Sequence, residues 1–326
     1  WRNKGEPEPA NPNFALGLHI PGRFDKILDI EECHLQPQIG NEIIGLVRTL
    51  ALQHDLKPYD PKTHNGFLRY LALRFTDGSE KVMVNIVTAW DNSEGLEPIV
   101  AALTEKFPEI ISIVNNINTR RGDASYGEKE ILLHGTPTIE EHLHNLTFEI
   151  SANSFFQTNT KQAEKLYSVA LEGAALTGKE IVYDLFCGTG SISLFLAQQA
   201  KEVYGFELVQ SAVEDATRNA LANRITNAHF YSAQLDFYFY KTDILKRLPK
   251  PDVIVIDPPR MGIHEKLARQ LPEMGAKRII YISCNPTTQA RDARYLLDGG
   301  YKLEKMTMVD MFPHTPHIET VAVFTR

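Results

Sequence analysis

The pattern of apolar and polar residues changes character near the middle of the chain. After residue 180, short apolar runs rich in Val, Ile, Tyr and Phe alternate with amphipathic stretches. Such runs are typical of strands buried on both faces, and their alternation with helices predicts an α/β domain with a doubly wound parallel sheet. We place its strands at Ile181–Phe186, Val203–Glu207, His229–Ala233, Val253–Asp257 and Ile279–Ser283.

Helical spacing connects these strands. It predicts helices over residues 192–199 and 211–223, and a further helix from Thr287 to the stop at Gly299-Gly300. Lys302–Met311 and Ile318–Phe324 follow with no helix between them, so we expect a terminal hairpin whose last strand runs antiparallel to the rest of the sheet.

The front half has a different pattern and no motif that indicates chemistry. A helix is predicted over Gln38–Gln53, and a hairpin is predicted from Leu68–Phe75 and Lys81–Val87 around Asp77-Gly78. Shorter elements are expected at residues 14–20, 24–30, 95–107, 110–115, 130–133 and 146–150. We therefore expect a smaller α+β domain over residues 1–150 and the α/β domain over 151–326, with a helix over 159–176 at the boundary.

Composition narrows the class of protein. The net charge of −7 argues against a protein that holds nucleic acid by bulk electrostatics alone. Three widely spaced cysteines exclude a disulfide framework and fit a reducing compartment, and no apolar run is long enough to span a membrane. We expect a cytoplasmic protein with no membrane partner. The start at Trp1 rather than Met suggests a fragment of a longer chain.

Cys284 stands at a position typical of a functional residue. Pro286 cannot donate to a ladder, so the strand before it must stop near Cys284, just before a helix begins. Ligands bind at that edge of open α/β sheets, and the helix dipole together with Arg291 would favour the thiolate. Cys284 is thus a candidate nucleophile, and the alternative is an inert buried thiol.

A glycine-containing turn follows the first strand of the predicted sheet. Asp184-Leu-Phe-Cys-Gly188-Thr-Gly190 lets the backbone approach a ligand, and Glu207 at the end of the next strand can accept both hydroxyls of a ribose. A dinucleotide site is the obvious competitor, but Ser193 stands where its third glycine would be. A nucleoside ligand without phosphates does not need that glycine, and the turn together with Glu207 resembles the site of class I methyltransferases that use S-adenosylmethionine. Cys187 is interpreted as small core filling.

The fourth strand ends in Asp257-Pro-Pro-Arg260. The two prolines stiffen a loop at the sheet edge and fix the direction of Asp257. Arg260 replaces the aromatic residue that follows such a motif in amine methyltransferases, so amine methylation is disfavoured. We interpret Arg260 as a contact to a phosphate or a base.

Several segments together resemble the uracil-5-methyltransferases that act on tRNA and ribosomal RNA. They are Ser154-Phe-Phe-Gln157-Thr-Asn159, Asp184–Gly190, Asp257–Arg260, Ser283–Asn285 and Phe312–Glu319. The resemblance implies a class I methyltransferase (Rossmann-like) sheet, with Cys284 as the nucleophile, Glu319 as the base that removes the C5 proton and Asp257 as the residue that orients the base. It also implies a cofactor site for S-adenosyl-L-methionine lined by Gln157, Phe186, Gly188, Gly190, Ser191, Glu207, Gln234 and Asp257. By the same resemblance, residues 1–150 would have a supporting or RNA-binding role and residues 151–326 would form the catalytic domain.

The sequence departs from that family in two ways. Many relatives carry Asn where Ser191 and Gln234 stand. Many ribosomal members also hold an iron–sulfur cluster on four cysteines, and only Cys33 fits one of those positions here, so a cluster is expected only in a longer parent chain and no metal site is expected in this one.

Alternative interpretations remain open. Ribosomal RNA is favoured over tRNA as substrate by the resemblance of Ile30–Cys33 to the cluster-bearing members. A nicotinamide-dependent oxidoreductase would share the glycine turn, and a non-catalytic RNA-binding module is a third possibility. His314 and His317 are rival bases, although roles in shaping their proline-containing loop are favoured. The basic pairs Arg120-Arg121 and Lys277-Arg278 are interpreted as solvated surface.

Overall fold

The structure, a computed structural model, describes residues 14–20, 22–77, 80–122, 125–235 and 243–326. The chain divides into two compact units, Trp1–Ile139 (unit 1) and Glu140–Arg326 (unit 2). The sequence placed this boundary between residues 150 and 151, which lies inside unit 2. None of the helices described is both long and apolar enough to cross a bilayer.

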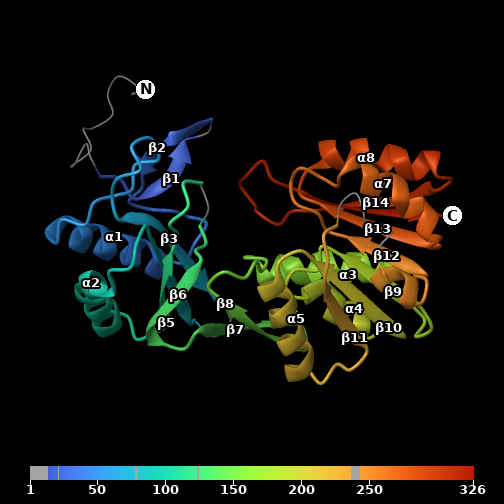
Figure 1. The fold of residues 1–326 in the computed structure, drawn as a ribbon, viewed down its shortest axis with the longest axis horizontal. Coiled ribbons are helices and arrows are strands. Elements are labelled where there is room, and N and C mark those ends of the chain that lie inside the picture. Colours follow the sequence, from blue (N-terminus) through green and yellow to red (C-terminus); the bar gives the residue numbers. More distant parts are fainter. Residues whose placement is uncertain (1–13, 21, 78–79, 123–124, 236–242) are drawn as a thin grey trace. The chain divides into compact units, whose positions relative to one another are not determined.

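Unit 1 is built on a four-stranded sheet in the order β3-β4-β5-β6 (Figure 1). Its strands are β3 (Leu68–Phe75), β4 (Val82–Thr88), β5 (Ile110–Ile117) and β6 (Lys129–Gly135). β3 and β4 pair antiparallel, which confirms the predicted hairpin, although Gly78 of its turn lies outside the described residues. The crossover through α2 (Ser93–Lys106) makes β4 and β5 parallel, and β6 is antiparallel to β5.

The core of unit 1 lies between this sheet and two helices. α1 (Gln38–Gln53), which has the predicted bounds, contributes Ile43 and Val47, and α2 contributes Leu96, Ile99 and Leu103. All five side chains are nearly or completely buried. A separate ribbon of β1 (Gly17–Ile20) and β2 (Arg23–Asp29) precedes α1.

Unit 2 contains a seven-stranded sheet in the order β11-β10-β9-β12-β13-β15-β14. Its strands are β9 (Ile181–Leu185), β10 (Glu202–Glu207), β11 (Ala228–Ser232), β12 (Val253–Ile256), β13 (Arg278–Ser283), β14 (Lys302–Val309) and β15 (Glu319–Thr325). The first five in chain order run parallel, and β15 enters antiparallel between β13 and β14. The predicted doubly wound sheet with an antiparallel last strand is confirmed.

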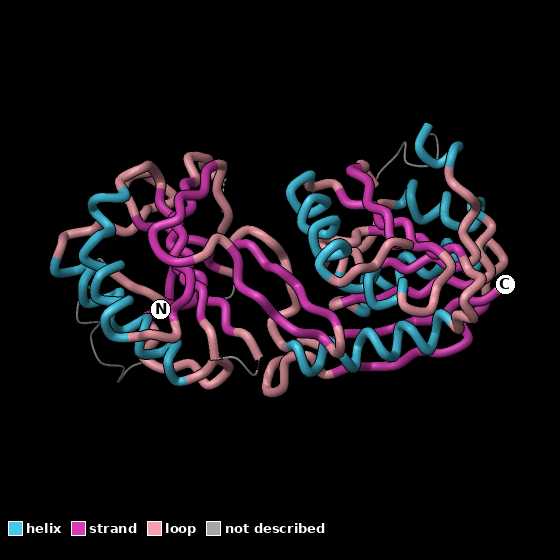
Figure 2. The backbone as a smooth tube through the Cα atoms, turned by 90° about the horizontal axis from the view of Figure 1, so that it is seen from below, coloured by secondary structure: helices cyan, strands magenta, loops and turns pink. Residues whose placement is uncertain are grey.

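Helices cover both faces of the seven-stranded sheet, as Figure 2 shows for unit 2. They are α3 (Thr160–Ala174), α4 (Ser191–Ala197), α5 (Gln210–Ala222), α6 (Asp243–Arg247), α7 (Glu265–Gln270) and α8 (Pro286–Asp298), with a 3₁₀ turn at Leu271–Met274. α3 covers one face of the sheet, with Gly173 lying close to the side chains of Val323 and Ile280. Tyr281 and Phe324 point to the opposite face, where they pack with Leu296 of α8. This alternation follows from the two-residue period of a strand.

The sequence missed some elements of unit 2. β7 (Thr138–Leu143) pairs with β8 (Leu146–Ser151) as a separate two-stranded sheet, and neither β7 nor α7 was predicted. β7 alternates buried and exposed positions, but a buried Glu141 stands at one of its inward positions and interrupts the apolar pattern. α7 is too short for a helical period to be visible.

Candidate active site

The predicted site residues gather at one edge of the seven-stranded sheet. Because β9, β10, β12 and β13 are parallel, their carboxyl ends meet at the same edge, and antiparallel β15 begins there. Phe186 and Gly188 follow β9, Glu207 ends β10, Asp257 follows β12, Cys284 follows β13 and Glu319 opens β15.

The turn after β9 has the backbone conformation of a ligand-binding turn. Gly188 and Gly190 have positive φ angles of 53° and 83°, and Phe186 also adopts φ 70°, which is rare for a residue with a side chain. A Cβ at Gly190 would approach Ala216 and a ring carbon of Phe230 at 3.0 Å. A Cβ at Gly188 would instead meet no atom within 4 Å, so the backbone is open on that side.

Glu207 is held against this turn by backbone donors. Its Oε2 accepts a hydrogen bond from the N–H of Gly188 at 3.2 Å, and its Oε1 accepts from Leu208 at 2.8 Å and Val209 at 3.0 Å. The carboxylate is therefore fixed at the strand end and remains partly accessible. A carboxylate in this position can accept hydrogen bonds from the hydroxyls of a ribose.

Asp184 lies beneath the turn and is fully buried. Its Oδ2 accepts from the hydroxyl of Ser193 at 2.5 Å, whereas its Oδ1 is buried without a partner among the described residues. Burial, and after it the charges of Asp257 and Glu207, raise the pKa of Asp184 to about 7. An open glycine turn, a fixed carboxylate and an unsatisfied buried oxygen fit a polar nucleoside ligand.

Cys284 and Glu319 are brought together by the pairing of β13 with β15. Ser283 is opposite Thr320 in the ladder, so the next residues outward are Cys284 on one strand and Glu319 on the other. The hydroxyl of Thr320 donates to the carbonyl of Ser283 at 3.1 Å and locks this end of the pair. Cys284 is partly exposed, whereas Glu319 is 6% exposed.

Acidic side chains dominate the electrostatics around the thiol. Burial raises the pKa of Glu319 to about 7. Burial and the charge of Glu319 raise the pKa of Asp257 to about 8. Burial, with the charges of Glu319 and Asp257, also raises the pKa of Cys284, and the nearby Arg260 opposes that rise.

The sequence interpretation of Arg291 was wrong. Arg291 pairs with the buried carboxylate of Asp292 and donates to the carbonyls of Met261 and Ile263. It therefore holds the loop after Asp257 instead of stabilising a thiolate, and the cation that favours the thiolate is Arg260. In the unliganded protein the environment of Cys284 favours the neutral thiol.

Arg260 lies beside the predicted catalytic residues. Its carbonyl accepts from the side chain of Asn285 at 3.1 Å, and its guanidinium lies 3.5 Å from Nδ1 of His317. His314 and His317, the two rival bases, are both exposed. Cys187 is 6% exposed, in agreement with its interpretation as a core residue.

The remaining predicted cofactor residues are Ser191, Gln157 and Gln234. Ser191 opens α4, and its hydroxyl lies 2.9 Å from that of Tyr167. Gln157 is partly buried in the segment before α3, and Gln234 is exposed just after β11. The structure brings Phe186, Gly188, Gly190 and Ser191 into one turn. The roles of these four residues, and those of Gln157 and Gln234, remain predictions.

Two aromatic residues at this edge were missed by the sequence. Tyr167 is 2% exposed, and the charges of Asp257, Asp184 and Glu319 act on its hydroxyl, whose pKa is raised chiefly by burial. Phe155 is 73% exposed, and its carbonyl accepts from Thr189 in the glycine turn. The adjacent pair Phe155-Phe156 was the signal in the sequence from which Phe155 could have been found. Phe156 is buried against Phe148, whereas Phe155 stays exposed.

No cluster of three or more potential metal ligands exists among the described residues. Cys33 is partly exposed, and its backbone N–H donates to the side chain of Asn41 at 2.9 Å.

Comparison with known proteins identifies the family of this chain. The sequence model of the tRNA (uracil-5-)-methyltransferase family matches residues 128–326. An uncharacterized RNA methyltransferase of Chlorobaculum tepidum is 42% identical over 314 residues, which make up 96% of this chain and 65% of that protein. One of Porphyromonas gingivalis is 44% identical over 317 residues, 96% of this chain and 68% of that protein. The chain spans about two thirds of the length of these curated relatives.

A solved structure extends the likeness to the fold. The tRNA (uracil-54, C5)-methyltransferase of Pyrococcus abyssi, in complex with S-adenosyl-L-homocysteine, is 33% identical, with a TM-score of 0.75 over 95% of this chain and 73% of that one. This agrees with the class I methyltransferase sheet of unit 2 and favours a methyltransferase over the oxidoreductase alternative. The chain belongs to the tRNA (uracil-5-)-methyltransferase family.

Proposed function

We propose that this chain carries the catalytic centre of an S-adenosylmethionine-dependent enzyme that methylates C5 of a uridine in RNA. The observation that carries the proposal is the pair of Cys284 and Glu319 at facing ends of β13 and β15, with Asp257 beside them. A nucleophile and a base held side by side are what substitution at C5 of uracil requires.

The glycine turn and its carboxylates would hold the cofactor. Glu207 would accept the ribose hydroxyls, and the open backbone at Gly188 would lie against the adenosine. The unpartnered Oδ1 of Asp184 is available to a donor on the ligand. When bound, S-adenosylmethionine supplies a methyl group on a positively charged sulfur. The complex of the Pyrococcus abyssi protein with S-adenosyl-L-homocysteine supports this assignment.

Cys284 activates the ring. Its sulfur, as the thiolate after its proton has passed to water on its exposed side, forms a bond to C6 of the uracil. The electron pair of the C5–C6 double bond moves toward C5 and O4, which makes C5 nucleophilic. A target base must leave its stack to reach Cys284, so the enzyme binds an extruded uridine.

Glu319 and Asp257 complete the reaction. After C5 has gained the methyl group, the carboxylate of Glu319 removes the C5 proton, the C–H electron pair restores the C5–C6 double bond, and the C6–S bond breaks to return the thiolate. Because its pKa is raised to about 8, the carboxyl of Asp257 retains its proton at neutral pH and can donate a hydrogen bond to O4, where negative charge develops.

A covalent adduct tests this proposal. RNA with 5-fluorouracil at the target position has no C5 proton to lose, so with the methyl donor the protein should remain bonded to RNA through Cys284, as read by mass spectrometry of the peptide. Cys284→Ala should abolish adduct and methylation and keep cofactor affinity. The matched control is Cys33→Ala, which removes another partly exposed free thiol and should leave both unchanged. An adduct on another side chain, or methylation by Cys284→Ala within a few-fold of wild type, refutes the mechanism.

Ribosomal RNA remains our predicted substrate, and tRNA is the second candidate because the Pyrococcus abyssi relative is named for a tRNA uridine. Methylation of purified 23S ribosomal RNA and of total tRNA, both lacking 5-methyluridine, separates the two. Incorporation confined to tRNA overturns the ribosomal prediction. We further propose that unit 1 supports the binding of the RNA.

A further inference from the structure

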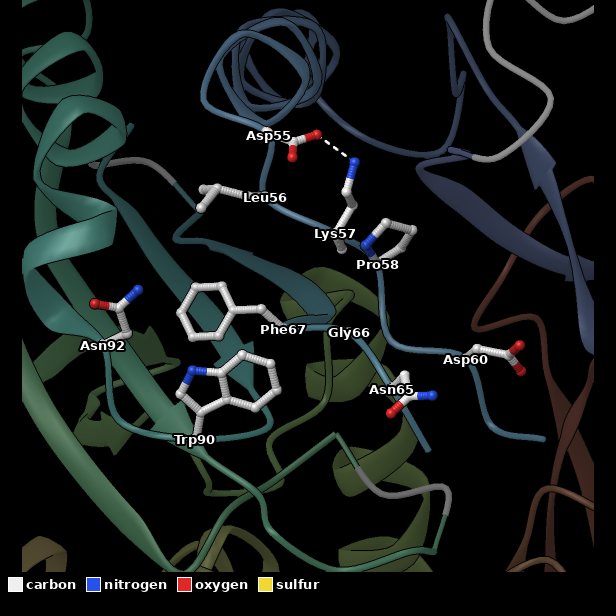
Figure 3. Close-up of a pocket in the computed structure, with 10 residues that line it drawn as sticks. All are labelled: Asp55, Leu56, Lys57, Pro58, Asp60, Asn65, Gly66, Phe67, Trp90 and Asn92. Carbon is white, nitrogen blue, oxygen red and sulfur yellow. Dashed lines mark hydrogen bonds and ion pairs between the residues drawn. The ribbon is translucent and has the colours of Figure 1, made fainter. Parts of the chain in front are cut away.

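Unit 1 contains a pocket that the proposed chemistry does not use. It has a volume of about 460 Å³, within the range of ligand sites. Figure 3 shows the indole of Trp90 beside the phenyl ring of Phe67, with Asn92 on one side and Asn65 on the other. The lining residues come from the end of α1, the loop before β3 and the start of α2; they are Asp55, Leu56, Lys57, Pro58, Asp60, Asn65, Gly66, Phe67, Trp90 and Asn92.

The pocket wall is a rigid backbone structure. The N–H groups of Phe67 and Leu68 both donate to the carbonyl of Lys57, at 2.8 and 2.9 Å, and the N–H of Ala89 donates to the carbonyl of Phe67 at 2.8 Å. Gly66 has φ 102°, and a Cβ there would lie 2.0 Å from the carbonyl oxygen of Pro58. The wall is thus formed before any ligand binds.

An aromatic surface lies at the centre of this pocket. Trp90 is 47% exposed, although its ring packs against the buried Phe67 with centroids 5.2 Å apart and an interplanar angle of 44°. The hydroxyl of Thr88 donates to the carbonyl of Trp90 at 2.9 Å and fixes its backbone. A supported indole with an open face is a stacking surface for a planar ring.

Two amide side chains flank that surface. Asn65 and Asn92 are exposed, and neither amide has a hydrogen-bond partner among the described residues, although Asn92 precedes α2 at a position where Asn commonly caps. Amides can pair with the donor and acceptor edge of a nucleobase. Asp55 forms an ion pair with Lys57, and Asp60 accepts the backbone N–H of Lys62, so both carboxylates of the wall have partners of their own.

Two arginines, Arg69 and Arg121, belong to the structure next to the pocket wall. The guanidinium of Arg69 lies 4.2 Å from the ring centroid of Tyr59, the residue next to Pro58. The same guanidinium donates to the carbonyls of Asn118, Arg120 and Gly122 at 2.6 to 2.8 Å. Arg69 therefore connects the pocket wall to the loop that carries Arg121. Arg121 is exposed, and its guanidinium is suited to binding a phosphate.

We infer that this pocket binds one unstacked nucleobase of the RNA substrate, with Trp90 as its stacking surface, Asn65 and Asn92 on its edge, and Arg121 near the neighbouring phosphate. The inference rests on the proposed function for the nature of the ligand. It also assigns to Arg121 a role that the sequence alone did not support. Recognition of a single unstacked base other than the reacting uridine would contribute to the choice of RNA.

Fluorescence of Trp90 provides a direct test. The chain contains two tryptophans, Trp1 and Trp90, so Trp1→Phe leaves Trp90 as the only indole. Titration with a short single-stranded RNA of mixed sequence should quench its emission, because stacking brings a base onto the ring. Adenosine and uridine monophosphates should quench only at far higher concentrations. Unquenched emission at saturating RNA overturns the inference, as does equal affinity for the mononucleotides, which would indicate a small-molecule site.

Variants measure the contribution to RNA affinity. Trp90→Ala should weaken RNA binding by about 5- to 100-fold, the effect of losing one stacked base, whereas Trp90→Phe should stay within a few-fold of wild type. Leu132→Ala is the matched control, since Leu132 is 46% exposed in the same unit, and it should bind RNA normally. Asn92→Ala and Arg121→Gln should each weaken binding and leave S-adenosylhomocysteine affinity unchanged.

Methylation assays separate this inference from the proposed function. In a methylating enzyme, Trp90→Ala should raise the KM for RNA and leave kcat nearly unchanged. RNA binding that depends on Trp90 in a protein that does not methylate uridine would refute the proposed function alone. Methylation with normal RNA affinity in Trp90→Ala and Trp90→Phe would refute the pocket alone.

Discussion

The pH dependence of catalysis follows from two carboxyl groups, that of Glu319 at the start of β15 and that of Asp257 after β12. With a pKa of about 7, Glu319 is about one tenth carboxylate at pH 6 and about nine tenths at pH 8, so the step that needs the base should accelerate about tenfold over this range. Asp257, with a pKa of about 8, loses the proton it donates at higher pH, and the rate should fall again. Wild-type kcat should therefore give a bell centred between pH 7 and 8.

Glu319→Gln should change this profile in a defined way. Removing the base should slow release of methylated RNA by about 10²- to 10⁴-fold and remove the acid limb of the profile. The charge of Glu319 is one of the two causes that raise the pKa of Asp257, so the remaining alkaline limb should move to lower pH. Asp257→Asn should instead abolish the alkaline limb, because an amide donates at every pH.

Single-turnover kinetics between pH 5.5 and 9 check these expectations, with methyl transfer and RNA release followed separately and covalent RNA quantified on a denaturing gel. Glu304→Gln is a suitable control, because Glu304 lies on β14, pairs with Arg278 of β13 and is outside the predicted catalytic group. If Glu319→Gln releases free product at the wild-type rate with an unchanged acid limb, Glu319 is not the base and the reasoning fails.

Further predictions concern the cofactor turn and the loop after Asp257. Glu207→Gln should weaken S-adenosylhomocysteine binding by about 10- to 100-fold, measured by calorimetry, with RNA affinity unchanged; unaltered cofactor affinity would remove Glu207 from the site. Gly205→Ala should destabilise unit 2 by about 1–3 kcal/mol in urea unfolding, because its Cβ would lie 2.6 Å from the ring of Phe230, and wild-type stability would contradict that packing. Asp292→Ala should lower the free energy of unfolding by about 3–5 kcal/mol, because it leaves the hydroxyl of Tyr281 and the N–H of Ile263 without an acceptor. Amide hydrogen exchange at Ile263 should accelerate in this variant. Slow exchange there would show that the N–H has another acceptor.

Local patterns in the sequence were sufficient to predict which residues lie at the edge of the sheet where we propose catalysis. The β-branched run before Pro286 placed Cys284 at a strand end, and the lack of a helix between the last two apolar runs predicted the antiparallel hairpin that carries Glu319. Both features depend on neighbours in sequence, which is why they could be predicted.

Features that depend on distant neighbours could not be predicted in this way. Arg291 is near Cys284 in sequence, yet the carboxylate of Asp292 and two loop carbonyls bind its guanidinium, and Arg260 is the cation that acts on the thiol. The Trp90 pocket likewise joins the end of α1 to a loop and to the start of α2. No periodicity in the sequence marks such a meeting of separate segments.

The ladder between β13 and β15 has a consequence for the loop that joins β14 to β15. Residues 310–318, which form this loop, lie outside the six paired positions from Arg278–Thr325 to Ser283–Thr320. The separation of the sulfur of Cys284 from the carboxylate of Glu319 is therefore set by main-chain hydrogen bonds between the two strands. A rearrangement of the loop when RNA binds would leave the spacing of these two groups unchanged.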